Sequence, residues 1–229
     1  MNKFWNIAIL PIFEKINSKH MVEIGCFRGS NTQKILKFCK ENNAKLSAID
    51  PKPLFNTEGL KALYNESFDF YEDTSINSLP LIRDYDIVLI DGDHNWYTVY
   101  NELKIIEKSN AADSFPMVLL HDVAWPYARR DVYYNPENIP PEFRHPHKKA
   151  GMKRGYSPLL EKGGANASLY NAMHEGGEKN GVLTAVEDFL NETKRNLTFK
   201  MTEKSHGLGI IFQSNKSLDQ FIEDILTKF

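Results

Sequence analysis

The stretch MVEIGCFRGSNT, residues 21–32, has the pattern of a buried strand that runs into glycines and then into a polar helix start. Gly25 and Gly29 fall where the strand gives way to the helix. Glycine permits a positive φ and lets a ligand approach the backbone. The polar residues 30–32 (Ser-Asn-Thr) can cap the following helix. Such a strand end is either a plain turn or a place where the backbone lies against a ligand.

Apolar runs alternate with amphipathic stretches along the rest of the chain. We expect strands at 21–27, 45–51, 68–73, 85–93, 117–123, 197–203 and 208–213. We expect helices at 3–17, 31–42, 57–65, 96–109, 181–195 and 217–228. The continuous apolar runs DIVLI (86–90) and MVLL (117–120) are typical of parallel strands that are buried on both faces.

The order of these elements predicts an α/β fold with a Rossmann-like, doubly wound, seven-stranded sheet and helices on both faces. Most of the sheet is expected to be parallel, because helices separate its first strands. Only the short KSHG (204–207) separates the last two strands, and parallel strands need a longer crossover. The C-terminal strand is therefore expected to be antiparallel.

The chain has 229 residues, 41% of them hydrophobic and 25% charged, which indicates a single soluble globular domain over 1–229. A net charge of -2 gives no support for nucleic-acid binding. Cys26 and Cys39 form no metal-binding spacing, so a reduced compartment is the simplest interpretation. No signal peptide or membrane-spanning segment is expected, and the cytoplasm follows by default.

Residues 124–180 interrupt the strand–helix rhythm with many prolines, glycines, aromatic residues and charges. A long segment of this kind inside a domain is usually functional, so we expect an ordered insertion on the substrate side of the site. Its aromatic residues suit sugars or planar substrates, and its basic residues suit a phosphate or carboxylate. A solvated loop or an oligomer contact is the alternative.

Acidic residues follow the second and third expected strands. Asp50 ends the strand at 45–51, where its carboxylate can accept hydrogen bonds from both hydroxyls of a ribose. Asp73 ends the strand at 68–73 and can accept from an adenine amino group. The first loop has the spacing E-x-G-x-x-x-G, which fits a dinucleotide fingerprint poorly. The alternative is that these acids only stabilise turns or cap helices.

A second group of polar residues follows the two most apolar strands. Asp91, Asp93 and His94 end the strand at 85–93, and His121 with Asp122 ends the strand at 117–123. If these strands are neighbours, both groups meet at one edge of the sheet. Crowded carboxylates repel one another unless a cation or a proton intervenes. Oxygen ligands suit Mg²⁺, and a site that includes histidine also suits Mn²⁺ or another transition metal.

Together these motifs resemble the class I S-adenosylmethionine-dependent methyltransferases. VEIGCFRGSNT is similar to their first motif and SAIDP (47–51) to their second. The resemblance spans about 20–123 and resumes at the C-terminal hairpin. It implies that three residues line the methionine end of the cofactor: Glu23, Gly25 and Gly29. It also implies that Asp50 holds the ribose, that Asp73 and Thr74 lie on the adenine side, and that Asp91 lies beside the cofactor.

LIDGDH (89–94) followed by HD (121–122) resembles the metal-dependent O-methyltransferases of the macrolide- and aminocoumarin-sugar type, a methyltransferase family 24-like group. That resemblance implies three metal ligands: Asp91, His121 and Asp122. The position of His121 is usually an acid in the family. Asp93 is the first candidate for the base that takes the proton of the acceptor hydroxyl, and His94 is the second. Helix capping or another structural role is the alternative for His94.

The sequence therefore predicts an S-adenosylmethionine-dependent O-methyltransferase that acts with a divalent metal on a hydroxyl of a sugar-containing small molecule or glycan. A noncatalytic nucleotide-binding module is one alternative. A metal-dependent hydroxylase is another, although no two-His-one-carboxylate spacing is evident. No nucleic-acid or membrane partner is expected, and the question of a homo-oligomer stays open.

Overall fold

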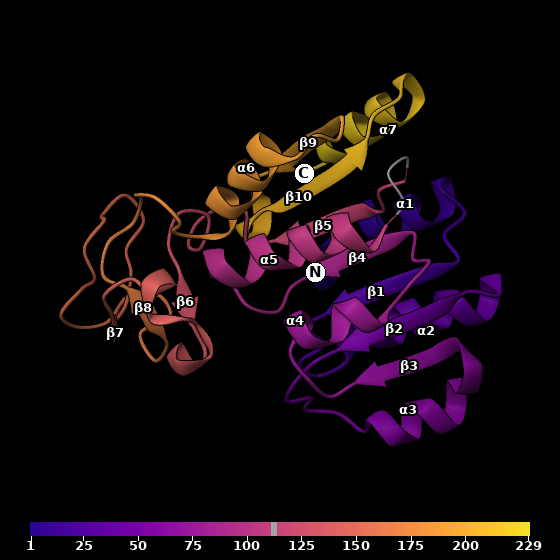
Figure 1. Cartoon of the computed structure of the whole chain (residues 1–229), viewed down its shortest axis with the longest axis horizontal. Helices are drawn as coiled ribbons and strands as arrows, with labels where there is room; N and C mark the ends of the chain where they lie inside the picture. Colours follow the sequence, from indigo (N-terminus) through magenta and orange to yellow (C-terminus); the bar gives the residue numbers. More distant parts are fainter. Residues whose placement is uncertain (111–113) are drawn as a thin grey trace.

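The computed structural model describes residues 1–110 and 114–229, and a seven-stranded sheet of order β3-β2-β1-β4-β5-β10-β9 forms its centre (Figure 1). The strands are β1 (His20–Ile24), β2 (Lys45–Ile49), β3 (Phe68–Tyr71), β4 (Ile87–Ile90), β5 (Met117–His121), β9 (Leu197–Thr202) and β10 (Leu208–Gln213). The first five are parallel, and β10 runs antiparallel to both β5 and β9. The predicted fold class is confirmed.

Helices cover both faces of this sheet (Figure 1). They are α1 (Leu10–Lys15), α2 (Ser30–Asn42), α3 (Thr57–Tyr64), α4 (Ser75–Ser78), α5 (Trp96–Ser109), α6 (Val182–Glu192) and α7 (Lys216–Leu226). Side chains alternate along each strand. In β4, Ile87 and Leu89 therefore join the core beneath α1, α2 and α7, whereas Val88 and Ile90 join the core beneath α5 and α6. Two apolar layers on one strand explain its continuous apolar sequence.

The N-terminal helix expected at 3–17 is a helical run over residues 2–15 with three hydrogen-bonding patterns. It consists of the 3-10 turn η1 (Asn2–Phe4), the π turn η2 (Trp5–Ile9) and then α1. Pro11 follows the last hydrogen bond of the π turn, from the Leu10 N–H to the Trp5 carbonyl, and it has no N–H with which to continue that pattern. The remaining 3-10 turns are η3 (Asn65–Ser67), η4 (Leu79–Leu81), η5 (Pro136–Asn138), η6 (Pro141–Phe143) and η7 (Lys204–His206).

Residues 124–180 contain a second, three-stranded sheet of order β6-β8-β7. Its strands are β6 (Val132–Tyr133), β7 (His147–Lys149) and β8 (Tyr170–Ala172). Figure 1 shows this sheet beyond the edge where the parallel strands end. A small core of its own includes Tyr127, Val132 and Met152. Strands of two or three residues are too short to give a periodic sequence signal, so none of them was predicted.

Asp131 ties this segment to the main sheet. Its side chain is fully buried and accepts hydrogen bonds from the backbone N–H groups of Trp96 and Gly181, both at 2.7 Å. The Tyr133 hydroxyl donates to the same carboxylate at 2.8 Å. One acid thus fixes the starts of α5 and α6 and the strand β6 relative to one another.

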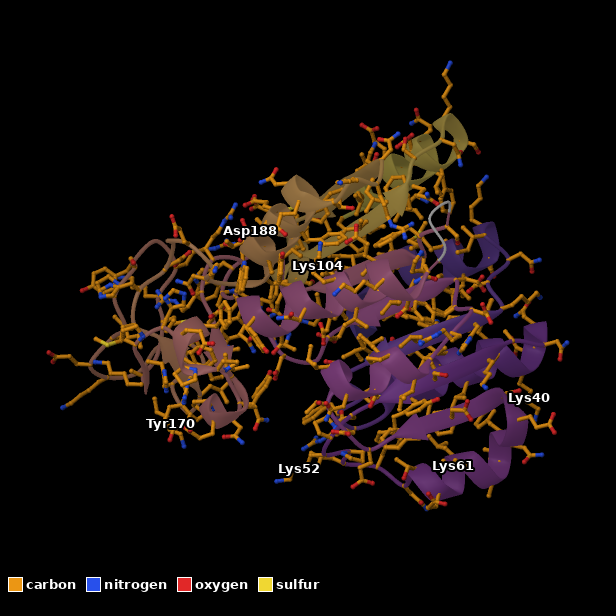
Figure 2. The ribbon with its side chains drawn as sticks, viewed as in Figure 1. Lys40, Lys52, Lys61, Lys104, Tyr170 and Asp188 are labelled. Atoms are coloured by element: carbon orange, nitrogen blue, oxygen red, sulfur yellow. The ribbon has the colours of Figure 1, made fainter. Side chains whose placement is uncertain are left out.

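Charged side chains such as Lys40, Lys52 and Lys61 project from the outside of the molecule (Figure 2). Cys26 and Cys39 are buried and unpaired. Within 1–110 and 114–229, no helix combines the length and the apolar character that crossing a membrane requires.

Candidate active site

The glycine loop after β1 is shaped by close contact with the end of β4. Gly25 has a φ of 85°, and a Cβ added there would lie 2.3 Å from the backbone oxygen of Asp91. No side chain fits such a gap, so β1 and β4 can approach this closely only with glycine at position 25. Gly29 has a φ of 72° and is the N-cap of α2, without a side-chain cap. The expectation that residues 30–32 cap this helix is therefore wrong, because they lie inside it.

Glu23 lies at the end of β1, beneath this loop. The Asn31 side chain donates to its Oε1 at 2.9 Å, whereas its Oε2 is buried without a hydrogen-bond partner. Burial raises the pKa of Glu23 to about 7. A buried acceptor without a donor costs free energy unless water or a ligand reaches it. This residue can therefore accept a hydrogen bond from a ligand amino group.

Asp50, at the end of β2, shapes the same loop. Its Oδ2 accepts from the backbone N–H groups of Cys26 and Phe27, each at 2.8 Å, and its Oδ1 accepts from Lys52 N–H at 2.8 Å. Asp50 therefore stabilises the turns around it, as the structural alternative for this acid stated. Each carboxylate oxygen has a second lone pair, so the same side chain can also accept from a ligand hydroxyl.

Asp73 has a similar local role after β3. It is exposed, and its Oδ1 accepts from the Thr74 N–H at 2.6 Å and from the Asn77 side chain at 3.0 Å. These bonds, the backbone one first, lower the pKa of Asp73. Thr74 is the N-cap of the short helix α4. The structure thus places both residues at the sheet edge where the sequence expected them.

The ends of β4 and β5 bring two acids and two histidines together. His121 Nδ1 lies 2.9 Å from Asp91 Oδ1 and 2.6 Å from Asp122 Oδ2. His94 Nε2 lies 3.0 Å from Asp122 Oδ2 and 3.6 Å from Asp91 Oδ1. One donor atom from each of the four residues lies within 4.8 Å of all the others. We call these four residues the DHHD cluster; parallel pairing of β4 with β5 is what assembles it.

The DHHD cluster is buried at two of its residues and partly exposed at the other two, since the side chains of Asp91 and His121 are 25% and 15% exposed. Asp122 and His94 are 6% and 7% exposed. Burial favours the neutral forms, but the opposite charges outweigh it, so the pKa values of Asp91 and Asp122 are lowered and those of His94 and His121 are raised. The α-ammonium of Met1 adds a positive charge at 2.6 Å from Asp91 Oδ2.

A divalent cation fits these donors. Despite the short distances, His94 Nε2 and His121 Nδ1 are buried and make no hydrogen bond of acceptable geometry. Two imidazole nitrogens with two carboxylate oxygens form a ligand set that suits Mn²⁺, Fe²⁺, Co²⁺ or Zn²⁺, whereas Mg²⁺ prefers oxygen alone. The sequence placed both histidines at this edge of the sheet but showed no two-His-one-carboxylate spacing, because each histidine follows a different strand; the structure brings both together with two carboxylates.

Asp93 lies next to the DHHD cluster but outside it. The Thr98 hydroxyl donates to Asp93 Oδ2 at 3.1 Å, and burial raises the pKa of Asp93. Asn95, not His94, caps α5, because its side chain accepts from the Thr98 N–H at 2.9 Å. The helix-capping alternative for His94 is therefore wrong.

Glu102 is a further buried acid that the sequence did not single out. It lies on α5 four residues after Thr98, and both of its carboxylate oxygens are buried without hydrogen-bond partners. Burial raises its pKa to about 8, and the nearby charge of Asp93 acts in the same direction. The only sequence signal is an acid on the apolar face of this helix.

The segment 124–180 reaches the DHHD cluster through Tyr134. The Tyr134 hydroxyl lies 3.2 Å from His94 Nδ1, and the Tyr127 ring lies 5.7 Å from the His94 ring. Two arginines of the segment are engaged elsewhere: Arg129 pairs with Glu187, and the buried Arg130 donates to backbone carbonyls. Two aromatic residues of the segment thus lie against His94.

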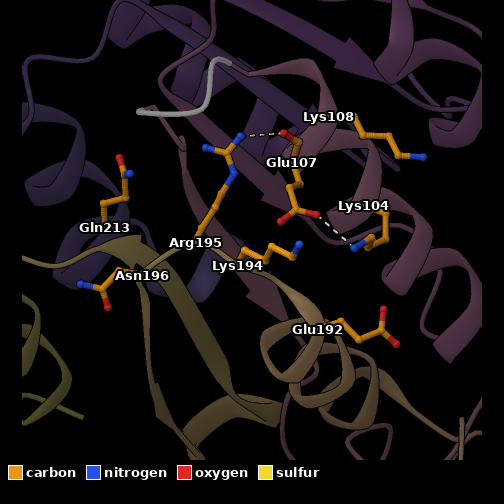
Figure 3. A pocket seen from close by; sticks show the side chains of 8 residues that line it. All are labelled: Lys104, Glu107, Lys108, Glu192, Lys194, Arg195, Asn196 and Gln213. Atoms are coloured by element: carbon orange, nitrogen blue, oxygen red, sulfur yellow. Dashed lines mark hydrogen bonds and ion pairs between the residues drawn. The ribbon is translucent and has the colours of Figure 1, made fainter.

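An open hollow of about 760 Å³ lies elsewhere, between α5, α6 and the antiparallel strands (Figure 3). Lys104 pairs there with Glu107 at 3.0 Å, and Arg195 donates to the Glu107 carbonyl at 2.9 Å. Because these charged groups satisfy one another in an open surface, the hollow gives no reason to place the chemistry there.

Comparisons with known proteins bear on the domain and the fold that carry this site. Residues 22–123 match the family model of a methyltransferase domain (Methyltransf_24). No curated protein matches the sequence. Among solved structures, the SAH-bound methyltransferase PaMTH1 of Podospora anserina is similar with a TM-score of 0.52 and 13% identity, over 92% of this chain and 77% of that one.

Two further structures have the same fold. A proposed caffeoyl-CoA O-methyltransferase from Staphylococcus aureus has a TM-score of 0.51 and 12% identity, over 89% of this chain and 80% of that one. A proposed O-methyltransferase from Nostoc punctiforme PCC 73102 has a TM-score of 0.51 and 14% identity, over 90% and 54% of the two chains. Residues 22–123 thus match a methyltransferase-domain model, in a chain that has the Rossmann-like fold of these methyltransferase structures.

Proposed function

We propose that this protein is an S-adenosylmethionine-dependent O-methyltransferase that requires a divalent metal. The observation that carries the proposal is that the DHHD cluster lies directly beside the glycine loop. Asp91 contributes a side chain to the cluster, and its backbone oxygen contacts Gly25. The strand ends that would hold a cofactor and those that would hold a metal thus share one edge of the sheet, where α/β folds bind ligands.

For the cofactor, we assign the methionine end to Glu23, Gly25 and Gly29. The unpaired Glu23 Oε2 can accept from the amino group of the methionine part. Asp50 is assigned to the ribose hydroxyls, and Asp73 with Thr74 to the adenine side. These residues lie at the ends of β1, β2 and β3, in the order in which an extended nucleoside would cross them.

For the reaction, the acceptor hydroxyl attacks the methyl carbon, the carbon–sulfur bond breaks, and the hydroxyl proton leaves. A bound metal would lower the pKa of this hydroxyl. We propose Asp91, His121 and Asp122 as its ligands. Asp93 is the proposed base, because it lies between Asp91 and His94 in the chain and the Thr98 hydroxyl holds one of its oxygens in place. The fold supplies the alignment of hydroxyl, methyl and sulfur.

For the acceptor, we propose a sugar-containing small molecule or glycan. The support comes from two aromatic residues: Tyr134 is 54% exposed and lies beside His94, and Trp125 lies three residues after Asp122 in the chain. Exposed aromatic faces stack on sugar rings, and polar neighbours can bind their hydroxyl groups.

Calorimetric titration with S-adenosylhomocysteine and, in parallel, with NAD⁺ tests the proposal. We expect binding of S-adenosylhomocysteine only, and at least a tenfold loss of that binding in Asp50→Ala. A matched control is Asp69→Ala, a surface acid on β3 that pairs with Lys45. Binding of NAD⁺ instead would contradict the proposal. Methyl transfer that persists in the presence of a chelator would contradict its metal requirement.

A further inference from the structure

We infer that His94 is a fourth metal ligand and that Tyr134 orients it, so that this site takes a transition metal in preference to Mg²⁺. The inference deepens the proposed function, since it concerns the same site. It also separates the two candidate bases, because an imidazole nitrogen bound to a metal cannot accept a proton. Asp93 is then the remaining base.

The position of His94 Nε2 is the first observation. It lies 3.0 Å from Asp122 Oδ2 and 3.6 Å from Asp91 Oδ1, and it is buried without a well-formed hydrogen bond. It therefore shares a centre with the donor atoms of the three proposed ligands, all within 4.8 Å. Four donor atoms that converge on one centre from two strand ends are the arrangement that a bound cation requires, and the cation would displace the protons that the two histidines hold in its absence.

The other nitrogen of the same ring is the second observation. Histidines that bind a metal through one nitrogen nearly always use the other in a hydrogen bond, which fixes the tautomer and the ring orientation. His94 Nδ1 lies 3.2 Å from the Tyr134 hydroxyl, so a proton on Nδ1 can be donated to that oxygen. With Nδ1 protonated, Nε2 presents its lone pair to the DHHD cluster. Tyr134 thus acts as a positioning residue from the segment 124–180.

The donor set decides the metal. Two nitrogen and two oxygen donors, with positions left for water or a substrate oxygen, suit Co²⁺, Mn²⁺, Fe²⁺ or Zn²⁺. Mg²⁺ binds imidazole weakly and demands an octahedral oxygen shell. Substitution of a nitrogen donor should therefore lower Co²⁺ affinity much more than Mg²⁺ affinity.

Titration of the metal-free full-length protein with Co²⁺ and with Mg²⁺, followed by visible absorption and calorimetry, tests this inference without any methyl transfer. We expect Co²⁺ to bind at least tenfold more tightly than Mg²⁺. In His94→Asn we expect roughly a hundredfold loss of Co²⁺ affinity and a changed d–d spectrum, since a nitrogen ligand is lost. In Tyr134→Phe we expect about a tenfold loss with the wild-type spectrum.

The control is Tyr156→Phe, an exposed tyrosine of the same segment, which should bind Co²⁺ like the wild type. Wild-type affinity and spectrum in His94→Asn, or Mg²⁺ binding as tight as that of Co²⁺, would overturn the inference. Because Tyr134 is half exposed, its variant is expected to fold even if His94→Asn does not, and an unchanged Co²⁺ affinity in it would overturn the role of Tyr134. Failure to bind S-adenosylhomocysteine would remove the proposed function and leave this inference standing.

Discussion

His94 Nε2 lies 3.0 Å from Asp122 Oδ2, although the two residues follow different strands of the sheet. The contact exists because β4 and β5 are parallel neighbours in register, so that their carboxyl ends coincide. Two acids and two histidines then share a partly buried space. Their charges balance only when protons or a cation are present, which makes the DHHD cluster sensitive to both.

Asp122→Asn should weaken metal binding without disturbing the backbone. Asp122 has a φ of 60°, a conformation that asparagine tolerates as well as aspartate. The substitution removes one negative charge from the cluster, so we expect at least a tenfold loss of Mn²⁺ affinity. Thermal unfolding with and without Mn²⁺ measures the effect. The exposed Asp73→Asn serves as control, and equal Mn²⁺ stabilisation of both variants would argue against a metal at the DHHD cluster.

Gly25→Ala should destabilise the fold by more than the backbone strain of a positive φ alone would cost. The new Cβ would lie 2.3 Å from the Asp91 backbone oxygen. The backbone at Asp91 can move away only if β4 separates from β1. We expect a loss of about 3 kcal/mol or more in the free energy of unfolding, measured by urea denaturation. Gly176 has a similar φ of 87° with no atom within 4 Å of an added Cβ.

Gly176→Ala should therefore cost only about 1 kcal/mol, the strain of the left-handed conformation. The difference between the two variants isolates the contact with β4. Equal losses would mean that the packing of the glycine loop against β4 contributes nothing beyond backbone strain.

The sequence was informative where periodicity is strong. The apolar runs at 86–90 and 117–120 predicted buried parallel strands, and the polar residues after them were expected to meet if those strands paired, as they do. The short strands β6, β7 and β8 escaped prediction because two or three residues carry no period. The contact between His94 and Tyr134 could not be predicted either, since it depends on how the segment 124–180 folds back.

Helix starts show a related limit. Residues 30–32 have the composition of caps, yet Gly29 starts α2 and Asn31 turns inward to Glu23. Composition shows which residues can cap a helix, whereas the backbone conformation of the preceding loop, here a φ of 72° at Gly29, sets where the helix begins. At Gly25, the close packing of the loop against the backbone of Asp91 requires glycine, whatever ligand the loop binds.

Glu102→Gln should reduce the dependence of stability on pH. The pKa of Glu102 is about 8 in the folded protein and near 4.5 when unfolded, so the unfolded chain releases its proton first. The contribution of Glu102 to stability is therefore complete below about pH 4.5 and is lost as pH rises towards 8. Between pH 5 and 8.5, the wild type should lose on the order of 3 kcal/mol more than Glu102→Gln.

Urea denaturation of both proteins at the two pH values measures this difference. The exposed Glu161→Gln is the matched control and should follow the wild type. Parallel pH profiles for the wild type and Glu102→Gln would show that Glu102 is ionised in the folded protein, with a donor that satisfies its carboxylate.

Asp131→Asn should loosen the segment 124–180. Asp131 accepts from two backbone N–H groups and one hydroxyl, and an amide nitrogen in place of one oxygen would oppose such donors. We expect a loss of about 2 kcal/mol in the free energy of unfolding and faster proteolysis within 124–180. Asp188→Asn is the control, because Asp188 accepts from the Trp96 indole N–H at 2.7 Å and an amide oxygen can replace that acceptor. If both variants were equally stable and equally resistant to protease, the segment would be held by its apolar contacts, and Asp131 would not be its anchor.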